Sequence, residues 1–191
     1  TGFEVCAPTD TCKAGAHGNG DGQFWGPLGV EVDGSGNVYV AEAINSRIQK
    51  FASDATYVLQ WGGPGSGDGQ FNYPVDLTTD GSGNVFVADI DNQRVQKFDS
   101  GGAYLTQWGS NGSGDGQFFN PSAIATDGAG NVYVAEAGNH RVQKFDGAGN
   151  YLAKWGSPGN GDGEFLGPFG LEVDAAGGLY VSEAYNYRVQ K

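Results

Sequence analysis

Side chains suited to acid–base, nucleophilic or metal chemistry are scarce in this sequence. It contains two histidines, His17 and His140, and two cysteines. A metal centre or a catalytic triad needs such groups at ligand or hydrogen-bonding spacing, and the two histidines show no such spacing. We therefore predict no catalytic residue and no metal site, and we interpret His140 as a solvated loop residue.

The two cysteines are close together in the sequence. Cys6 and Cys12 flank a short segment that contains a proline, and a pair at this spacing can close a hairpin with a disulfide. We predict a Cys6–Cys12 disulfide, which suits an oxidising compartment; two free thiols are the alternative. The sequence has one glycosylation sequon, at residues 111–113, but this short motif is common by chance.

Most other polar residues that could form a site recur at a fixed interval of 47 residues. The marker Gly-Asp-Gly-Gln/Glu-Phe begins at residues 20, 67, 114 and 161. Four such units fill nearly the whole chain of 191 residues. A repeat of this kind decides the fold before any other signal does, and no separate domain fits into what remains.

Each unit carries a carboxylate that is followed by an asparagine three residues later and an arginine five residues later. The carboxylates are Glu42, Asp89, Glu136 and Glu183, and the arginines are Arg47, Arg94, Arg141 and Arg188. A guanidinium can bind a carboxylate and also reach loop carbonyls. Because four identical corners are poor evidence for one active site, we interpret this set as a structural network rather than a ligand site.

The Gly-Asp-Gly loops contain a second recurring carboxylate, at Asp21, Asp68, Asp115 and Asp162. Glycines let carbonyl oxygens converge, and Ca²⁺ prefers oxygen ligands, so these loops are candidate calcium sites. However, each loop supplies only one carboxylate, whereas a dedicated calcium loop brings several. We expect ordinary turns and no cofactor, with calcium as the alternative.

Within each unit, four short runs alternate β-branched or aromatic residues with others and end at turn residues. In the first unit, these runs are residues 28–32, 38–42, 47–51 and 57–61. No window shows a helical stripe. A four-stranded antiparallel sheet at this period is typical of a β-propeller blade. We therefore predict an all-β propeller of four blades, with the first strand of each blade nearest the axis.

The two ends of the chain contain complementary parts of a blade. Lys191 ends the sequence within the third strand of the fourth unit, while residues 10–15 lie one period before the fourth strand of the first unit. We expect residues 1–19 to complete the last blade of a domain formed by residues 20–191, because this pairing covers two open sheet edges. The same strand can instead pair with another copy and produce rings or filaments.

The units differ most in two loops, the one before the first strand and the one between the second and third strands. Strand polarity places both loops on one face of the propeller. Because repeats diverge where a surface is free to change, we predict that this face binds the ligand, with aromatic anchors; drift in unconstrained loops is the alternative. The predicted binding residues are Trp25, Ile44, Tyr73, Asp91, Phe119, His140, Leu166, Tyr185 and Tyr187.

Residues 27–33, 36–42 and 45–51, together with their copies in the other three units, resemble the NHL repeat. The resemblance covers about residues 20–191 and implies a propeller, usually of six blades, that serves mostly as a platform for proteins or RNA. A minority of NHL proteins are lyases with a metal and histidine-rich centre. This sequence departs from the family in having four units, which leaves open a closed four-bladed ring, a piece of a larger ring, or blades completed by other chains. It also has no matching set of histidines.

The charge of the chain argues against several partners. Ten Lys and Arg against 22 Asp and Glu give a net charge of −12, which repels nucleic acid and anionic membranes. No apolar run approaches the roughly 18 residues of a membrane helix. We predict a non-enzymatic binding or assembly module, extracellular or at the cell surface, with a protein or carbohydrate ligand. The alternatives are a metal-dependent lyase and a subunit that self-associates through an unpaired blade edge.

Overall fold

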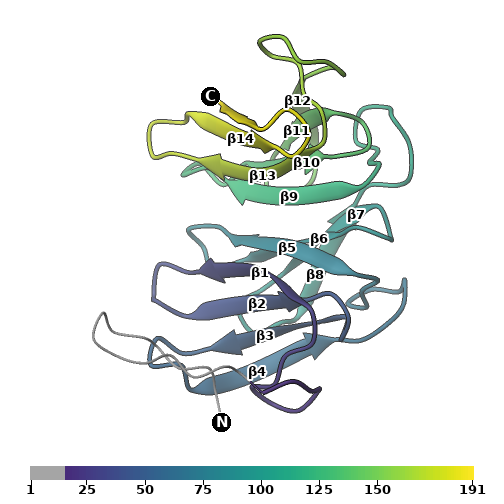
Figure 1. Ribbon diagram of the computed structural model, residues 1–191. Coiled ribbons are helices and arrows are strands. Elements are labelled where there is room, and N and C mark those ends of the chain that lie inside the picture. Colours follow the sequence, from purple (N-terminus) through teal and green to yellow (C-terminus); the bar gives the residue numbers. More distant parts are fainter. Residues whose placement is uncertain (1–15) are drawn as a thin grey trace.

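The computed structural model describes residues 16–191, which form fifteen strands and no helix (Figure 1). The strands make four antiparallel sheets arranged around one axis as the blades of a propeller. The predicted all-β propeller of 47-residue units is confirmed. None of these residues belongs to a helix that could cross a membrane. Cys6, Cys12 and the predicted strand at residues 10–15 lie outside the described residues.

Strands that are neighbours in sequence pair within each blade. The first blade contains β1 (Pro27–Val32), β2 (Val38–Glu42), β3 (Arg47–Phe51) and β4 (Tyr57–Gly62). The second contains β5 (Pro74–Thr79), β6 (Val85–Asp89), β7 (Arg94–Phe98) and β8 (Tyr104–Trp108). The third contains β9 (Pro121–Thr126), β10 (Val132–Glu136), β11 (Arg141–Phe145) and β12 (Tyr151–Trp155). In the fourth, the described strands are β13 (Pro168–Val173), β14 (Leu179–Glu183) and β15 (Arg188–Gln190).

An aspartate forms the first hairpin of every blade. Asp33 Oδ1 accepts hydrogen bonds from the backbone N–H groups of Ser35 and Asn37, both at 2.9 Å. Gly36 lies between them with φ +82°, a conformation that glycine adopts without steric cost. The carboxylates of Asp80, Asp127 and Asp174 make the same pair of bonds in the later blades. The strand and turn spacing of the sequence therefore sets the local structure.

Neighbouring blades pack through apolar faces of their sheets. The core between the first and second blades contains Tyr39, Ala41, Ile48, Phe71, Leu77, Val85, Val87 and Phe98, all buried. Two equivalent cores join the second blade to the third and the third to the fourth. Trp61 also lies against Gly102 of the next blade, where a Cβ would be 2.8 Å from the indole Cδ2. Only glycine allows this close approach.

The arginine of each blade holds the linker that leads into that blade. Arg94 Nε donates to Asp89 Oδ2 at 2.8 Å, and its two Nη atoms donate to the carbonyls of Ser66, Gly67 and Gln70 at 2.7–3.0 Å. These carbonyls lie between β4 and β5. Burial raises the pKa of Asp89, so the ion pair is costly to desolvate, and its main effect is to fix the linker.

We expect Arg94→Ala to lower the free energy of unfolding by about 3–5 kcal/mol, because it leaves a buried carboxylate without its counter-charge. Arg188 makes the equivalent contacts in the last blade, but its side chain is 27% exposed, against 7% for Arg94. In the single chain, water can replace its bonds, so Arg188→Ala should cost less there than Arg94→Ala. Urea unfolding of both variants measures the difference. Equal losses would contradict the role assigned to burial.

Candidate functional site

The two variable loops of each blade meet at one end of the propeller. In the first blade, Ala43 N donates to Gly26 O at 2.8 Å, and in the third, Ala137 N donates to Asn120 O at 3.0 Å. The second and fourth blades contain equivalent bonds between the same two loops. The backbone of this face is therefore fixed by hydrogen bonds, while its side chains differ from blade to blade.

Large apolar side chains from all four blades are exposed in these loops. They are Trp25, Ile44, Tyr73, Phe119, Tyr185 and Tyr187. Asp91 is also exposed, and Leu166 is half-buried. The ring of His17 lies edge-on to Trp25, with ring centroids 5.2 Å apart. The predicted binding residues therefore lie in the loops at one end of the propeller, and one of them, Tyr73, also lines an axial cavity.

His140 differs from the expectation of a solvated side chain. It is half-buried, its φ is +54°, and its Nδ1 accepts a hydrogen bond from Gly167 N of the next blade at 3.1 Å. Gln93 occupies the same position one blade earlier, and its Oε1 accepts from Asn120 N at 2.7 Å. The side chain at this position caps the loop of the following blade, so His140 contributes to blade docking.

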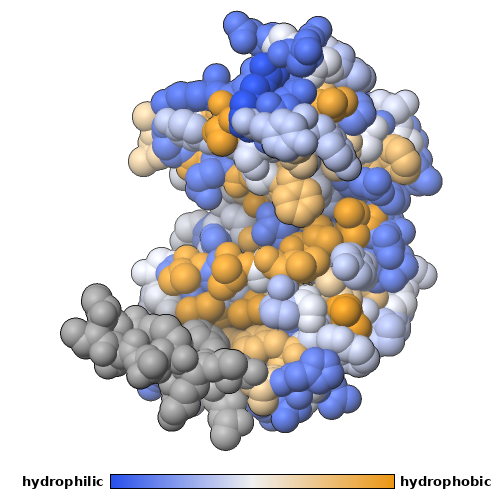
Figure 2. All heavy atoms as spheres, in the orientation of Figure 1, coloured by the Kyte–Doolittle hydropathy of each residue, from blue (hydrophilic) through white to orange (hydrophobic). Residues whose placement is uncertain are grey.

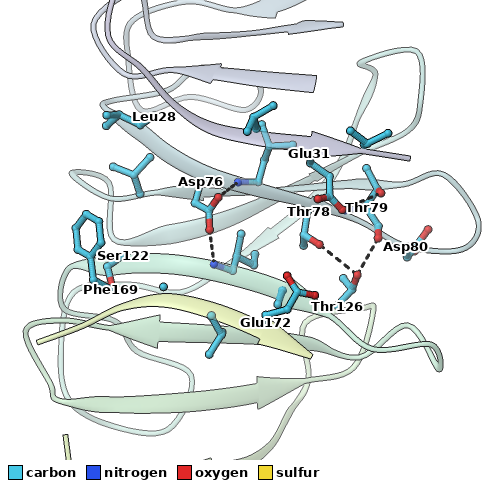
Figure 3. Close-up of a pocket in the computed structure, with 18 of the residues that line it drawn as sticks. Leu28, Glu31, Asp76, Thr78, Thr79, Asp80, Ser122, Thr126, Phe169 and Glu172 are labelled. Carbon is cyan, nitrogen blue, oxygen red and sulfur yellow. Dashed lines mark hydrogen bonds between the residues drawn. The ribbon is translucent and has the colours of Figure 1, made fainter. Parts of the chain in front are cut away.

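A cavity of about 980 Å³ runs along the axis between β1, β5, β9 and β13. Leu28, Tyr73, Ile90 and Phe169 lie at the end that faces the variable loops. Four carboxylates also line the cavity, those of Glu31, Asp76, Asp80 and Glu172 (Figure 3). The described lining residues include no Lys, Arg or His. The cavity is therefore an acidic channel with an apolar rim.

Asp76 is the most constrained of these carboxylates. Its Oδ1 accepts from Leu77 N at 3.0 Å and its Oδ2 from Ile124 N at 2.9 Å, so it bridges β5 and β9 (Figure 3). Burial by surrounding protein atoms raises the pKa of Asp76 to about 6, and the negative charges of Glu31 and Glu172 act in the same direction. Burial also raises the pKa of Glu31. The channel therefore favours a positive or hydrogen-bond-donating group.

Sequence reasoning did not select these channel carboxylates. At the position of Asp76, the other units have Gly29, Ala123 and Gly170. A carboxylate in a first strand, where the other copies have small residues, was the available signal. It becomes meaningful only when the four first strands are known to surround one cavity.

In the second and third blades, the Gly-Asp-Gly aspartate binds a side chain of the outermost strand. Asp115 Oδ1 accepts from Lys154 Nζ at 2.6 Å, and Asp68 Oδ1 accepts from Gln107 Nε2 at 3.4 Å. Over residues 16–191, no three carboxylate, histidine or cysteine side chains gather in a way that could hold a metal ion. The contacts of these aspartates hold a linker to its own blade.

The family model of the NHL repeat matches residues 24–51, 71–98 and 118–145. Each match begins at the phenylalanine that ends a Gly-Asp-Gly loop and finishes at the third strand. The comparison with curated proteins finds no match.

Several solved propellers share the fold. A streptogramin B lyase is 14% identical, with a TM-score of 0.66, and the match covers 87% of this chain and 51% of that one. A Bacteroides thetaiotaomicron protein of unknown function is 19% identical, with a TM-score of 0.71 and coverages of 85% and 46%. A nidogen/laminin complex gives 17% identity, a TM-score of 0.63 and coverages of 85% and 57%. The chain thus spans about half the length of these structures.

The raised pKa of Asp76 predicts a pH-dependent stability. A carboxyl whose pKa is about 6 when folded, against 3.8 ordinarily, stabilises the fold at low pH and loses this contribution as the pH rises through 6. The loss corresponds to about 3 kcal/mol. We compare the free energy of unfolding of Asp76→Asn with that of the wild type at the same pH. This difference should favour the variant more at pH 7 than at pH 4.

Urea unfolding at the two pH values measures this difference. Thr78→Val, a change without a titrating group in the same channel, is the control and should shift stability equally at both. A pH-independent difference between Asp76→Asn and the wild type would contradict the raised pKa.

Proposed function

Because three stretches of the chain match the NHL repeat and its sheets form a β-propeller, we propose that it is a non-enzymatic binding module whose ligand is a protein held on the variable loop face. The observation that carries this proposal is the exposure of large apolar side chains, from the variable loops of all four blades, at one end of the propeller. Aromatic residues in such a position are typical anchors of protein interfaces. The hydrogen-bonded loop backbones reduce the entropy lost on binding.

The acidic channel indicates the chemistry of the ligand. It opens beside Tyr73 and Phe169 and contains Glu31, Asp76 and Glu172 without a balancing cation among the described lining residues. A partner that places a Lys or Arg side chain in the channel and apolar residues on its rim would satisfy both features. The net charge of −12 would also speed the approach of a basic partner.

A metal-dependent lyase is the second candidate, supported by the similarity of the fold to a streptogramin B lyase. The scarcity of histidines argues against it. Metal analysis of the purified chain separates the two candidates. A stoichiometric transition metal that is lost on His140→Ala would favour the lyase and contradict the proposal of a binding module.

An extracellular location is part of the proposal and leads to a test of Cys6 and Cys12. We expect the chain, secreted from an expression host and denatured without reductant, to contain no thiol that reacts with Ellman's reagent, because a disulfide joins the two residues. After reduction, two thiols should react. Two reactive thiols before reduction would remove this support for an oxidising compartment.

Peptides selected from a random phage-displayed library test the binding face. We expect peptides that bind the wild type to bind Phe119→Ser at least about tenfold more weakly, since loss of an interface anchor commonly exceeds 1.4 kcal/mol. Glu172→Gln should weaken those that contain Lys or Arg. Leu152→Ser, on an exposed position of β12, is the matched control and should bind normally.

Two results would contradict this proposal. Peptides that bind Phe119→Ser as well as the wild type would place the interface elsewhere. A glycan-array signal that requires Phe119, with no peptide recovered from the library, would make carbohydrate the ligand class.

A further inference from the structure

Each of the three interfaces between blades is built from the same two sheet faces. Between the first and second blades, Ile48 of β3 lies on one face, here called the exit face, and Leu77 of β5 lies on the opposing entry face. Both are buried in one core. The equivalent pairs in the other two cores are Val95 with Ile124, and Val142 with Leu171.

The entry face of the first blade has no such partner among the described residues. Val30 stands at the position of Leu77, but it is 66% exposed, whereas Leu77 is 2% exposed. Leu28 and Val32 beside it are also exposed. A hollow of about 280 Å³ on this face is lined by apolar residues and a glycine of the first blade. Figure 2 shows apolar side chains gathered over β1 and β2.

The exit face of the fourth blade is open in the same way. Val189 stands at the position of Val142, which is fully buried, yet Val189 is 65% exposed. Tyr187 stands at the position of His140, which bonds the loop of the next blade, and it is 92% exposed. No core among residues 16–191 joins the first blade to the fourth.

These end faces have the composition of an internal interface. An open array of repeats ends in polar capping units, but Leu28, Val30 and Val32 are apolar in the first blade, as is Val189 in the last. Contiguous exposed apolar surface of this kind marks an association site. The surface that fits each end face is therefore the opposite face of another blade with this sequence pattern.

We propose that a second copy of this chain provides both missing faces, so that two copies form one closed propeller of eight blades. The exit face of each copy packs on the entry face of the other, and the two-fold axis coincides with the propeller axis. Two identical contacts close the assembly and leave no open face.

The length of the matched structures agrees with two copies. The match covers 46–57% of each of those chains, so each chain is about twice as long as the part that four blades match. Two copies of this chain together reach a similar length. This inference goes beyond the proposed binding function. It concerns the faces of the end blades. The open edge of β15 is a different surface, and residues 10–15 are expected to pair with that edge.

Complementary substitutions on the two end faces test the assembly by analytical ultracentrifugation. The wild type should have twice the 19.9 kDa mass of the chain. Val30→Lys alone and Val189→Glu alone should each halve that mass, because each buries an unpaired charge in both contacts. An equimolar mixture of the two variants should recover the two-copy mass, since one contact then joins Lys to Glu and the other is unchanged.

Leu105→Lys is the matched control, because Leu105 is an exposed apolar residue of β8 that lies on neither end face. It should retain the two-copy mass. Far-UV circular dichroism should give the same strand signal for every variant, since the replaced side chains are exposed in the single chain. A wild type of 19.9 kDa, an assembly larger than two copies, or single variants that keep the two-copy mass would each overturn the proposal.

Discussion

Ionising a carboxylate that is buried in a sheet is costly unless a positive group pairs with it, and in this chain that pairing connects each blade to the linker before it. The guanidinium of Arg94 that neutralises Asp89 also binds the carbonyls of Ser66, Gly67 and Gln70. Phe71, at the end of the same linker, is buried between the blades. The ion pair, the linker and the core between blades therefore form one unit, repeated along the chain, that fixes how each blade follows the last.

This repeated constraint leaves two regions free to differ, and both lie around the axis. The backbone of the loop face is held by its own hydrogen bonds, so most side chains there can differ between blades, although Gln93 and His140 each bond the loop of the next blade. The first strands of all four blades line the channel. One carboxylate such as Asp76 therefore changes the charge of the whole channel, even though the equivalent positions of the other blades carry no carboxylate. An apolar rim around an acidic interior arises from these two departures from the repeat.

The sequence predicts what depends on local spacing and misses what depends on the angle between blades. Strand ranges, the Asp33 turn and the pairing of Arg94 with Asp89 follow from residues close together in one unit. The channel carboxylates were missed because alternation along a strand does not say which side chains converge on an axis. His140 was expected to be solvated, but it bonds Gly167, a residue 27 positions later that only blade packing brings near. The exposure of the two end faces was missed for the same reason, because it depends on how the blades pack and not on spacing within one unit.

In a repeat scaffold of this kind, each blade contacts only the blades next to it in sequence. The structure of a single blade therefore does not specify how many blades the assembly contains. That number is decided where the first and last faces meet. If a second copy closes the ring about the propeller axis, the variable loops of both copies emerge on the same side, because a rotation about that axis preserves its direction. Two identical binding faces, turned the same way on one rigid body, would engage a partner with a repeated epitope by avidity. Closure would thus determine both the stability of the fold and the valency of its binding face.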